Sequence, residues 1–300
     1  MAAQMKVFVI VAPTVSGRAK QVLHEALNRH FALAAYVWES CEAVSDEAVS
    51  ACVRKKVAEG FGLIVAAGGD GTVSSVAHIL EGGAVPLGII PMGTGNLVAR
   101  ELGIPIDVDA AVALLAGRPR LRRIDAMRIG GRTYLLNAGV GINAEVIDRT
   151  TRLGKSLFGR SAYFGTAVWK VLQAKPQRLE VTVDGETRTF QATDVAISNC
   201  GILARGLNPN GPDVRADDGQ IDVCILCMKT PLEYPWYYFL KHIAPQYDNK
   251  VMHALVARKR VTVRSDAPIS VQADGDIIGA TPVDVDVLPA ALTVLVPEAG

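Results

Sequence analysis

The sequence lacks a strong excess of either charge, a long apolar run and a cationic leader. With 31 Lys and Arg against 30 Asp and Glu, the formal net charge is +1. No overall basic field therefore indicates nucleic acid as a partner. No run approaches the roughly 18 uninterrupted apolar residues that predict a transmembrane helix. The first short apolar run has no cationic region ahead of it, so we interpret it as a strand and expect no signal peptide.

The sequence also has few cysteines, and their number is odd. Scattered, unpaired cysteines are typical of reduced thiols, so we expect a cytoplasmic protein without a disulfide framework. Cys224 and Cys227 form a CxxC, but this motif lies in an apolar run that is typical of a strand. Residues three apart in a strand point to opposite faces, so these two cysteines are predicted to be buried thiols rather than zinc ligands.

What is present is a repeated pattern of strand, glycine turn and helix between Phe61 and Gly103. The apolar run Phe61–Ala67 ends at the turn Gly68–Thr72, and the run Val85–Ile90 ends at the turn Pro91–Asn96. Short apolar runs that end at glycines are typical of buried parallel strands. Because open parallel sheets bind ligands at the carboxyl ends of their strands, we expect the two turns to lie side by side in one site.

The residue types in these turns favour phosphate as the ligand. Glycines allow close approach of the backbone, and N–H groups at a helix start attract anions. Thr72 and Thr94 add hydroxyl donors. Asp70 repels phosphate, so its presence requires a metal ion, a ribose hydroxyl or the acceptor hydroxyl as its partner. The alternative is that the glycines only form tight turns, but the pair at this spacing favours a phosphate site.

The motifs GGDGT, PMGTGN and ARELGIP together resemble the diacylglycerol kinase catalytic family. That family includes bacterial lipid kinases and the sphingosine and ceramide kinases, and NAD kinases share its GGDG turn. The resemblance covers nearly the whole chain. It implies a transferase that moves the γ-phosphoryl group of ATP to the hydroxyl of a lipid alcohol, such as diacylglycerol or a sphingoid lipid, with Mg²⁺ bridging the phosphates.

The same resemblance assigns a set of nucleotide-binding residues. They are Pro13, Ser16, Gly17, Ser40, Gly68, Gly69, Asp70, Gly71, Thr72, Gly93, Thr94, Gly95 and Asn96. The match of Ser40 is loose, and Ala12 stands where the family has Asn. Ser16 and Gly17 by themselves would also fit the start of a helix, since Ser is a good N-cap.

A second group of assignments concerns carboxylates near the end of the chain. Asp274–Asp276 follows an apolar run, and its spacing alone predicts a hairpin turn. The family has Asp-Gly-Glu at this place, with the acidic pair linked to catalysis. The resemblance therefore implies that Asp276 or Asp274 is the general base, although Asp276 is one methylene shorter than Glu. Asp70 is the second candidate, because sphingosine kinases use the Asp of this turn.

The turn Asp217-Asp218-Gly219 is a polar turn by composition. It resembles the Asp-Gly turn that binds a structural magnesium in some bacterial members, where oxygen ligands suit the ion. We therefore assign Asp218 and Asp217 as candidate metal ligands, with Asp125 as a further member. Leu97 stands where those members have Asp, which leaves the network incomplete.

The pattern predicts two domains in the 300 residues. Residues 1–125 are expected to form an α/β domain with a parallel sheet. The resemblance implies that this domain is of the NAD kinase and diacylglycerol kinase type, that it binds the nucleotide and that residues 290–300 return to it.

From Arg120 the helix–strand alternation gives way to strands and hairpins. We expect the second strand of the first domain at Ala34–Glu39, a hairpin in which Arg122–Ile129 and Thr133–Asn137 are joined at Gly130-Gly131, and two strands near the end of the chain at Val283–Val287 and Leu292–Pro297. Residues 126–289 are therefore predicted to form a mostly antiparallel β-sandwich domain, and the resemblance implies that this domain contributes the lipid cleft and the acidic loop.

Two segments are rich in aromatic residues, Lys155–Lys175 and Tyr234–Ile243. We expect each to be a helix packed on a sheet or, alternatively, to line an acyl-chain cleft or contact a membrane. Because the expected acceptor is a lipid, we expect the protein to contact a membrane peripherally. The sequence leaves open whether the protein forms a homodimer. Two alternatives to a lipid kinase remain. One is an NAD kinase-like enzyme in which Asp70 contacts a ribose. The other is a catalytically inactive nucleotide-binding regulatory protein, suggested by Ala12, Leu97 and Asp276.

Overall fold

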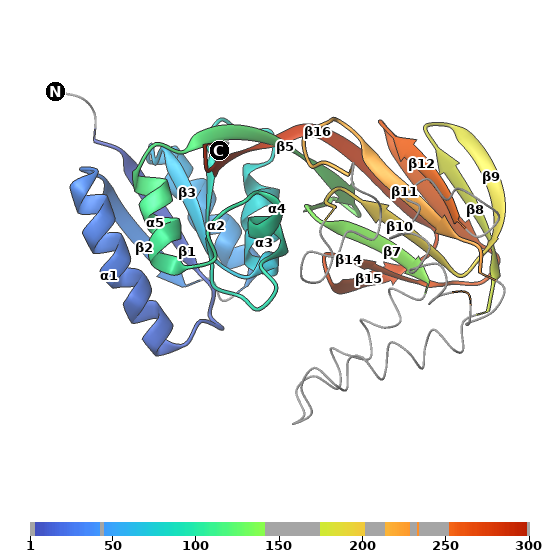
Figure 1. Cartoon of the computed structure of the whole chain (residues 1–300), viewed down its shortest axis with the longest axis horizontal. Helices are drawn as coiled ribbons and strands as arrows, with labels where there is room; N and C mark the ends of the chain where they lie inside the picture. Colours follow the sequence, from blue (N-terminus) through green and yellow to red (C-terminus); the bar gives the residue numbers. More distant parts are fainter. Residues whose placement is uncertain are drawn as a thin grey trace.

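The structure, a computed structural model, describes residues 4–42, 45–141, 175–201, 214–228, 233 and 252–298. An α/β part at the amino-terminal end is followed by a part made of strands (Figure 1). The predicted fold class, a parallel α/β domain followed by a mostly antiparallel β-sandwich, is confirmed.

The α/β part contains four parallel strands in the order β2-β1-β3-β4. Its elements are β1 (Lys6–Val11), α1 (Gly17–Leu33), β2 (Val37–Glu42), α2 (Asp46–Ala58), β3 (Leu63–Gly68), α3 (Asp70–Leu80), β4 (Leu87–Pro91), α4 (Leu97–Glu101) and α5 (Val108–Ala116). All six residues of β3 are buried. Continuous apolar strands of this kind need helices on both faces of the sheet.

The two faces of this sheet are covered by different helices. One core cluster contains α1 and α5 side chains such as Leu27, Phe31 and Leu115. The other cluster contains side chains of α2, α3 and α4, among them Val53 and Val76. Because β2 lies on one side of β1 and β3 on the other, the strand order reverses between β1 and β3. The crevice where ligands bind in open α/β sheets is expected there.

The second part consists of two packed layers of strands. One layer has the order β12-β11-β10-β7-β14-β15, and the other extends the first sheet through β16, β13, β8 and β9. A single core cluster takes side chains from both layers, such as Val181 and Val263 from one and Val140 and Ile197 from the other. The elements are β5 (Arg120–Ile129), β6 (Arg132–Tyr134), β7 (Asn137–Gly141), β8 (Gln177–Val183), β9 (Glu186–Ala192), β10 (Asp194–Ser198), β11 (Ile221–Leu226), β12 (Met252–Ala257), β13 (Arg260–Ser265), β14 (Ser270–Ala273), β15 (Asp276–Ala280) and β16 (Val283–Val296).

The long strand β16 connects the two parts of the molecule (Figure 1). It pairs with β13 near its start and runs parallel to β4 near its end, where Val294 lies opposite Leu87. We predicted two separate strands here, but one strand continues through an irregularity between Leu288 and Leu292. The chain end thus rejoins the first sheet, while the boundaries 1–125, 126–289 and 290–300 stay a prediction.

Two other predictions of secondary structure need correction. The second strand is β2 at Val37–Glu42 rather than 34–39, because α1 continues to Leu33. The hairpin around Gly130 and Gly131 is present, since β5 pairs with β6. The expected strand at 133–137, however, is split between the two layers: β6 stays beside β5, while β7 begins the second layer.

Of the two cysteines of the CxxC motif, Cys224 is buried within β11 as predicted, whereas Cys227 directly follows this strand and is only half-buried. Cys224 packs with Leu226 and Met228, whereas Cys227 contacts the core between the layers. The two aromatic segments predicted at 155–175 and 234–243 lie almost entirely outside the described residues. Within the described ranges, no helix is long and apolar enough to cross a membrane.

Candidate active site

The two glycine turns touch each other through their backbones, which confirms that they lie side by side. The N–H of Met92 donates to the carbonyl of Gly68 over 2.8 Å. A Cβ placed on Gly93 would lie only 2.5 Å from the Cα of Gly69. A side chain at Gly93 would therefore displace the first turn, so this glycine is required by the packing of the two turns.

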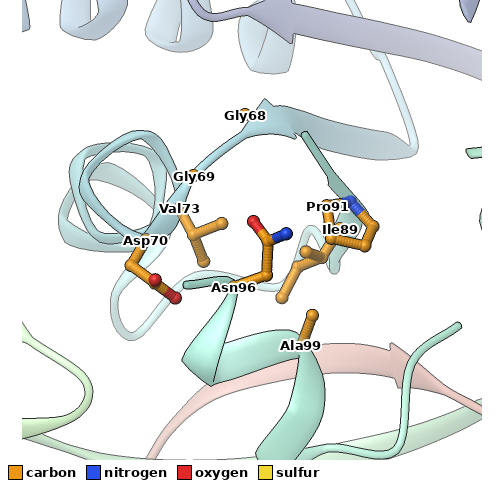
Figure 2. Close-up of a pocket in the computed structure, with 8 residues that line it drawn as sticks. All are labelled: Gly68, Gly69, Asp70, Val73, Ile89, Pro91, Asn96 and Ala99. Carbon is orange, nitrogen blue, oxygen red and sulfur yellow. The ribbon is translucent and has the colours of Figure 1, made fainter. Parts of the chain in front are cut away.

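Asn96 closes the second turn. It adopts the left-handed conformation, with φ 50° and ψ 45°, which Asn tolerates better than most residues. Its Oδ1 accepts from the N–H of Gly93 and its Nδ2 donates to the carbonyl of Gly93, both over 2.9 Å. The buried Asn96 side chain thus stabilises the second turn through its two hydrogen bonds to Gly93 (Figure 2).

Asp70 is the first residue of α3 and joins the two turns. Its Oδ1 accepts from the N–H of Val98 over 3.0 Å, so this carboxylate caps the start of α4. Its Oδ2 lies beside Gly95, where a Cβ would come within 3.1 Å. The sequence analysis did not predict this structural role. Its role toward a metal ion, a ribose or an acceptor stays a prediction.

The turns enclose a small hollow lined by Gly68, Gly69, Asp70, Val73, Ile89, Pro91, Asn96 and Ala99 (Figure 2). This hollow is too small to admit a water molecule. A phosphate, if the predicted site is correct, would therefore lie on the outer side of the turns, where Gly93, Thr94 and Gly95 are exposed. A Cβ placed on Gly71 would meet no other described atom within 4 Å, so this side of the first turn is also open.

The residues assigned after the first strand lie at the carboxyl end of β1. Pro13, Ser16 and Gly17 are exposed there, and Ser16 Oγ accepts from the N–H of Ala19 as the N-cap of α1. Ala12 is buried, and its Cβ is 2.9 Å from the place that a Cβ on Gly68 would take. The small side chain at position 12 therefore packs against the first glycine turn.

Ser40 lies within β2, opposite Val9 of β1, and is exposed. Its contact with a nucleotide stays a prediction.

Arg100 is a residue that our sequence analysis did not assign. Its Nε donates to the carbonyl of Gly95 over 3.1 Å, which places a guanidinium against the second turn. The ARELGIP motif that follows this turn contains Arg100 and was the signal that could have identified it.

Asp274 and Gly275 form the predicted hairpin turn between β14 and β15, with φ of 48° and 94°. The carboxylate of Asp274 receives four donors. Oδ1 accepts from the N–H groups of Leu136 (2.9 Å) and Asn137 (3.1 Å). Oδ2 accepts from the N–H of Leu135 (2.9 Å) and the hydroxyl of Ser74 (2.7 Å). Both oxygens of Asp274 are thus engaged by the protein.

The two acidic residues of this turn differ in environment. Burial raises the pKa of Asp274, and the hydrogen bonds from its four donors lower it only in part. Asp276 is exposed at the start of β15, and no hydrogen bond to its carboxylate occurs within the described part of the chain. Asp276 therefore has oxygen atoms open to a substrate, and Asp274 does not.

Carboxylates from separate elements converge on this region. Burial raises the pKa of the Cys200 thiol, and the negative charges of Glu101, Asp274 and Asp70 raise it further. Burial also raises the pKa of Tyr134, whose hydroxyl is near enough to Asp274 and Asp276 for both charges to act on it. The fold thus brings the first glycine turn and the acidic turn into one electrostatic neighbourhood.

The carboxylates predicted to hold a structural magnesium are engaged by protein groups instead. Asp217 Oδ2 accepts from Nε (2.9 Å) and NH2 (2.8 Å) of Arg122, and its Oδ1 accepts from Nε of Arg215 over 3.2 Å. These two guanidinium groups supply the positive charge that a metal ion would bring. The donors around Asp217 do not fit its assignment as a metal ligand.

Asp125 is buried, and its oxygens accept from the N–H groups of Gly219 (2.7 Å) and Ala290 (2.6 Å). Asp218 is exposed and accepts from the N–H of Gln220 over 3.0 Å. Across the described ranges, no group of three or more His, Cys, Asp or Glu residues is placed to hold a metal ion. The hydrogen bonds and ion pairs of these carboxylates therefore do not support the predicted structural magnesium.

A parallel α/β sheet with paired glycine turns, joined to a β-sandwich that brings an acidic hairpin toward them, defines the class of protein. Comparison with known families agrees with this architecture. Residues 6–129 match the Diacylglycerol kinase catalytic domain, and residues 137–296 match the YegS C-terminal NAD kinase beta sandwich-like domain. The chain belongs to this diacylglycerol kinase and YegS family of lipid kinases.

Individual proteins show the same similarity. A diacylglycerol kinase of Mycobacterium tuberculosis is 29% identical over 255 residues, covering 81% of this chain and 80% of the relative. An uncharacterised protein of Synechocystis sp. is 31% identical over 265 residues, or 85% of this chain, and the chain spans 60% of that relative's length. A solved diacylglycerol kinase from Bacillus anthracis superposes with a TM-score of 0.79 at 22% identity, covering 99% of both chains, which supports the fold.

Proposed function

We propose that this protein is an ATP-dependent lipid kinase that phosphorylates the hydroxyl of a lipid alcohol, such as diacylglycerol or a sphingoid lipid. One observation carries the proposal. The hydroxyl of Ser74, in the helix that begins at Asp70, binds Asp274 in the acidic hairpin. The phosphate turns and the candidate base therefore belong to one site. Membership of a kinase family implies the use of ATP.

The phosphates of ATP are proposed to lie against the outer side of the two glycine turns. The exposed backbone of Thr94 and Gly95 and the open side of Gly71 supply N–H donors there. The positive end of the α3 dipole adds a favourable field. The guanidinium of Arg100, held at Gly95, would neutralise charge on the transferring group.

Asp70 is proposed to hold Mg²⁺, because its Oδ2 lies beside the second turn while Oδ1 caps α4. Mg²⁺ held there would offset the charge that develops during transfer.

Asp276 is proposed as the general base. It takes the proton of the acceptor hydroxyl while that oxygen bonds to the γ-phosphorus and the bond to the β,γ-bridging oxygen breaks, leaving ADP. Its exposed carboxylate at the start of β15 supports this role. Asp274 supports Asp276 rather than acting as the base, because its oxygens already accept four hydrogen bonds. Asp70 is the second candidate for the base.

We further propose that residues 1–125 and 290–300 bind the nucleotide and that residues 126–289 receive the lipid. Because the acceptor would reside in a membrane, the protein is proposed to bind membranes peripherally. A boundary near residues 125 and 126 is supported by the two family matches, which cover residues 6–129 and 137–296, whereas the return of residues 290–300 is supported by the pairing of β16 with β4.

The test is incubation of the purified protein with γ-labelled ATP and Mg²⁺, in parallel with a total lipid extract and with NAD, followed by identification of the labelled product. The Asp276→Asn variant serves as the inactive control. A labelled phospholipid supports the proposal and names the acceptor. Label on NAD alone would contradict the lipid kinase proposal and would indicate an NAD kinase-like function. ATP binding without turnover on either acceptor would make the protein a nucleotide-binding regulator.

A further inference from the structure

Ser74 is a buried serine, 3% exposed, in the middle of α3. It lies four residues after Asp70, so the two side chains are on the same face of the helix, one turn apart. The Ser74 hydroxyl donates to Asp274 Oδ2 over 2.7 Å, although the two residues are 200 positions apart in the chain. This hydrogen bond joins the helix of the first glycine turn to the acidic hairpin.

We propose that Ser74 is a positioning residue for phosphoryl transfer: by holding Asp274, it sets where Asp276 stands relative to the phosphate turns. The inference rests on the proposed kinase function. Asp274 is two residues before Asp276 in the same tight turn, so a displacement of one moves the other. Rates of positioned reactions are sensitive to such displacements, and about 1 Å costs roughly 100-fold.

The origin of the four donors explains why Ser74 has this role. Three of them are the N–H groups of residues 135–137, which connect β6 to β7 beside the hairpin. These bonds hold Asp274 within the strand-rich part of the molecule. The fourth donor, Ser74, comes from the helix of the α/β part. Loss of its hydroxyl therefore releases the hairpin from the phosphate site without unfolding the hairpin itself.

The charge state of Asp274 gives this role a pH signature. Burial raises the pKa of Asp274, and the hydrogen bond from Ser74 is among the interactions that lower it. Removal of the hydroxyl must therefore raise this pKa further. Around Asp274, the pKa values of Tyr134 and Cys200 are raised, so neither group adds a charge near neutral pH.

The other titratable groups in this neighbourhood are carboxylates, paired cations and His78, which lies one turn after Ser74 on α3 with its Nδ1 3.2 Å from the hydroxyl of Thr133. Asp276 shares the hairpin, and Asp70 lies one turn from Ser74 on α3. The cations Arg122 and Arg132 are paired with the carboxylates of Asp217 and Asp46. A Ser74→Ala change is thus not compensated by a nearby free cation among these groups.

The neighbouring serine provides a matched control. Ser75 Oγ lies 2.7 Å from Asp46 Oδ1 and 2.9 Å from the carbonyl oxygen of Gly71, either of which can accept its single hydrogen, and it accepts from Arg132 over 3.2 Å. Ser75→Ala removes the same atom from the same helix. It also weakens a contact between the two parts of the molecule, but it leaves Asp274 untouched.

The experiment compares kcat, the KM for ATP and the pH profile of kcat in the wild type, Ser74→Ala, Ser74→Thr and Ser75→Ala. Ser74→Ala should lower kcat by about 10- to 100-fold with the KM for ATP within about twofold. The acidic limb of its kcat profile should move to higher pH, and Ser74→Thr, which keeps a hydroxyl, should restore both. A Ser74→Ala profile that matches that of Ser75→Ala would overturn the inference while leaving the kinase function intact.

A second measurement does not depend on activity. The stability difference between wild type and Ser74→Ala should be full at neutral pH and should shrink as pH falls through the raised pKa of Asp274, above the ordinary value of 3.8. For Ser75→Ala the decrease should occur at lower pH, because the hydrogen bond from Ser75 lowers the pKa of Asp46. Parallel curves would overturn the Ser74–Asp274 tie, even if no lipid is phosphorylated.

Discussion

Exchanging each aspartate of the acidic hairpin for asparagine separates catalysis from stability. Asp276 is exposed, so Asp276→Asn should change the free energy of unfolding by no more than about 0.5 kcal/mol. If Asp276 is the base, the same change should lower kcat by about 10²–10⁴-fold, because proton transfer from the acceptor is lost. The affinity for ATP should stay nearly unchanged, since the nucleotide is held by the glycine turns.

Asp274→Asn should have the opposite balance. The Asn side chain keeps one acceptor oxygen, but its NH₂ group would face backbone N–H groups that now donate to the carboxylate of Asp274. With the NH₂ group at the Oδ1 position, the bonds from Leu136 and Asn137 are lost; at the Oδ2 position, only the bond from Leu135 is lost, because the Ser74 hydroxyl can turn to accept. At about 1.5 kcal/mol for each bond, the lower end for bonds to a charged group because removal of a buried charge offsets part of the loss, the destabilisation is about 1.5–3 kcal/mol. The melting temperature should fall by roughly 2–5 °C, since unfolding of a chain of this length has a large entropy.

The assays are thermal unfolding by circular dichroism and turnover with labelled ATP on the acceptor identified from the lipid extract. Asp276→Glu should keep substantial activity because it restores the residue of the family, and it controls for disturbance of the hairpin. If Asp276→Asn turns over within about threefold of wild type, Asp276 is not the base. If Asp274→Asn melts with the wild type, the four-donor account of its carboxylate is refuted.

Three further predictions concern the phosphate turns and the membrane. Asp70→Asn keeps an acceptor oxygen for the cap of α4, so the variant should fold normally by circular dichroism. Its turnover should nevertheless fall by more than about 100-fold, and near-normal turnover would contradict a role of Asp70 as metal ligand or base. Gly93→Ala should destabilise the fold by about 1–3 kcal/mol through its clash with the first turn, whereas Gly71→Ala should fold normally and weaken ATP binding in calorimetry; unchanged affinity in Gly71→Ala would place the phosphates elsewhere. The protein should co-sediment with anionic vesicles, and Trp236→Ala with Phe239→Ala should reduce this binding; equal sedimentation of both forms would move the contact to another segment.

Much of the α/β part could be predicted from the sequence because its signals are local. The apolar runs of β1, β3 and β4 stop at or shortly before a proline or a glycine, and these residues indicate where each strand ends. Ser16 and Ser45 cap α1 and α2 through bonds to residues three positions later, so these helix starts depend on neighbouring residues alone. The side-by-side placement of the two glycine turns then follows from the geometry of a parallel sheet.

The strand-rich part was less predictable because pairing between strands depends on distant partners. The sequence between Arg132 and Gly141 resembles the second strand of one hairpin. In the structure the chain changes layers at Leu135 and Leu136, whose N–H groups turn to Asp274. The exposed strand β12 was missed for a related reason, since its alternating pattern is weak.

The sequence by itself determined which residue types occupy the site: two glycine turns, Asp70 and a pair of aspartates around Gly275. Only the tertiary structure decided what each carboxylate can do. Asp274 is engaged because Ser74 and residues 135–137 meet it from far along the chain, and Asp217 is paired because Arg122 lies against it, 95 positions away. Hydrogen bonds and ion pairs between such residues depend on packing, because local propensity describes only neighbours along the chain.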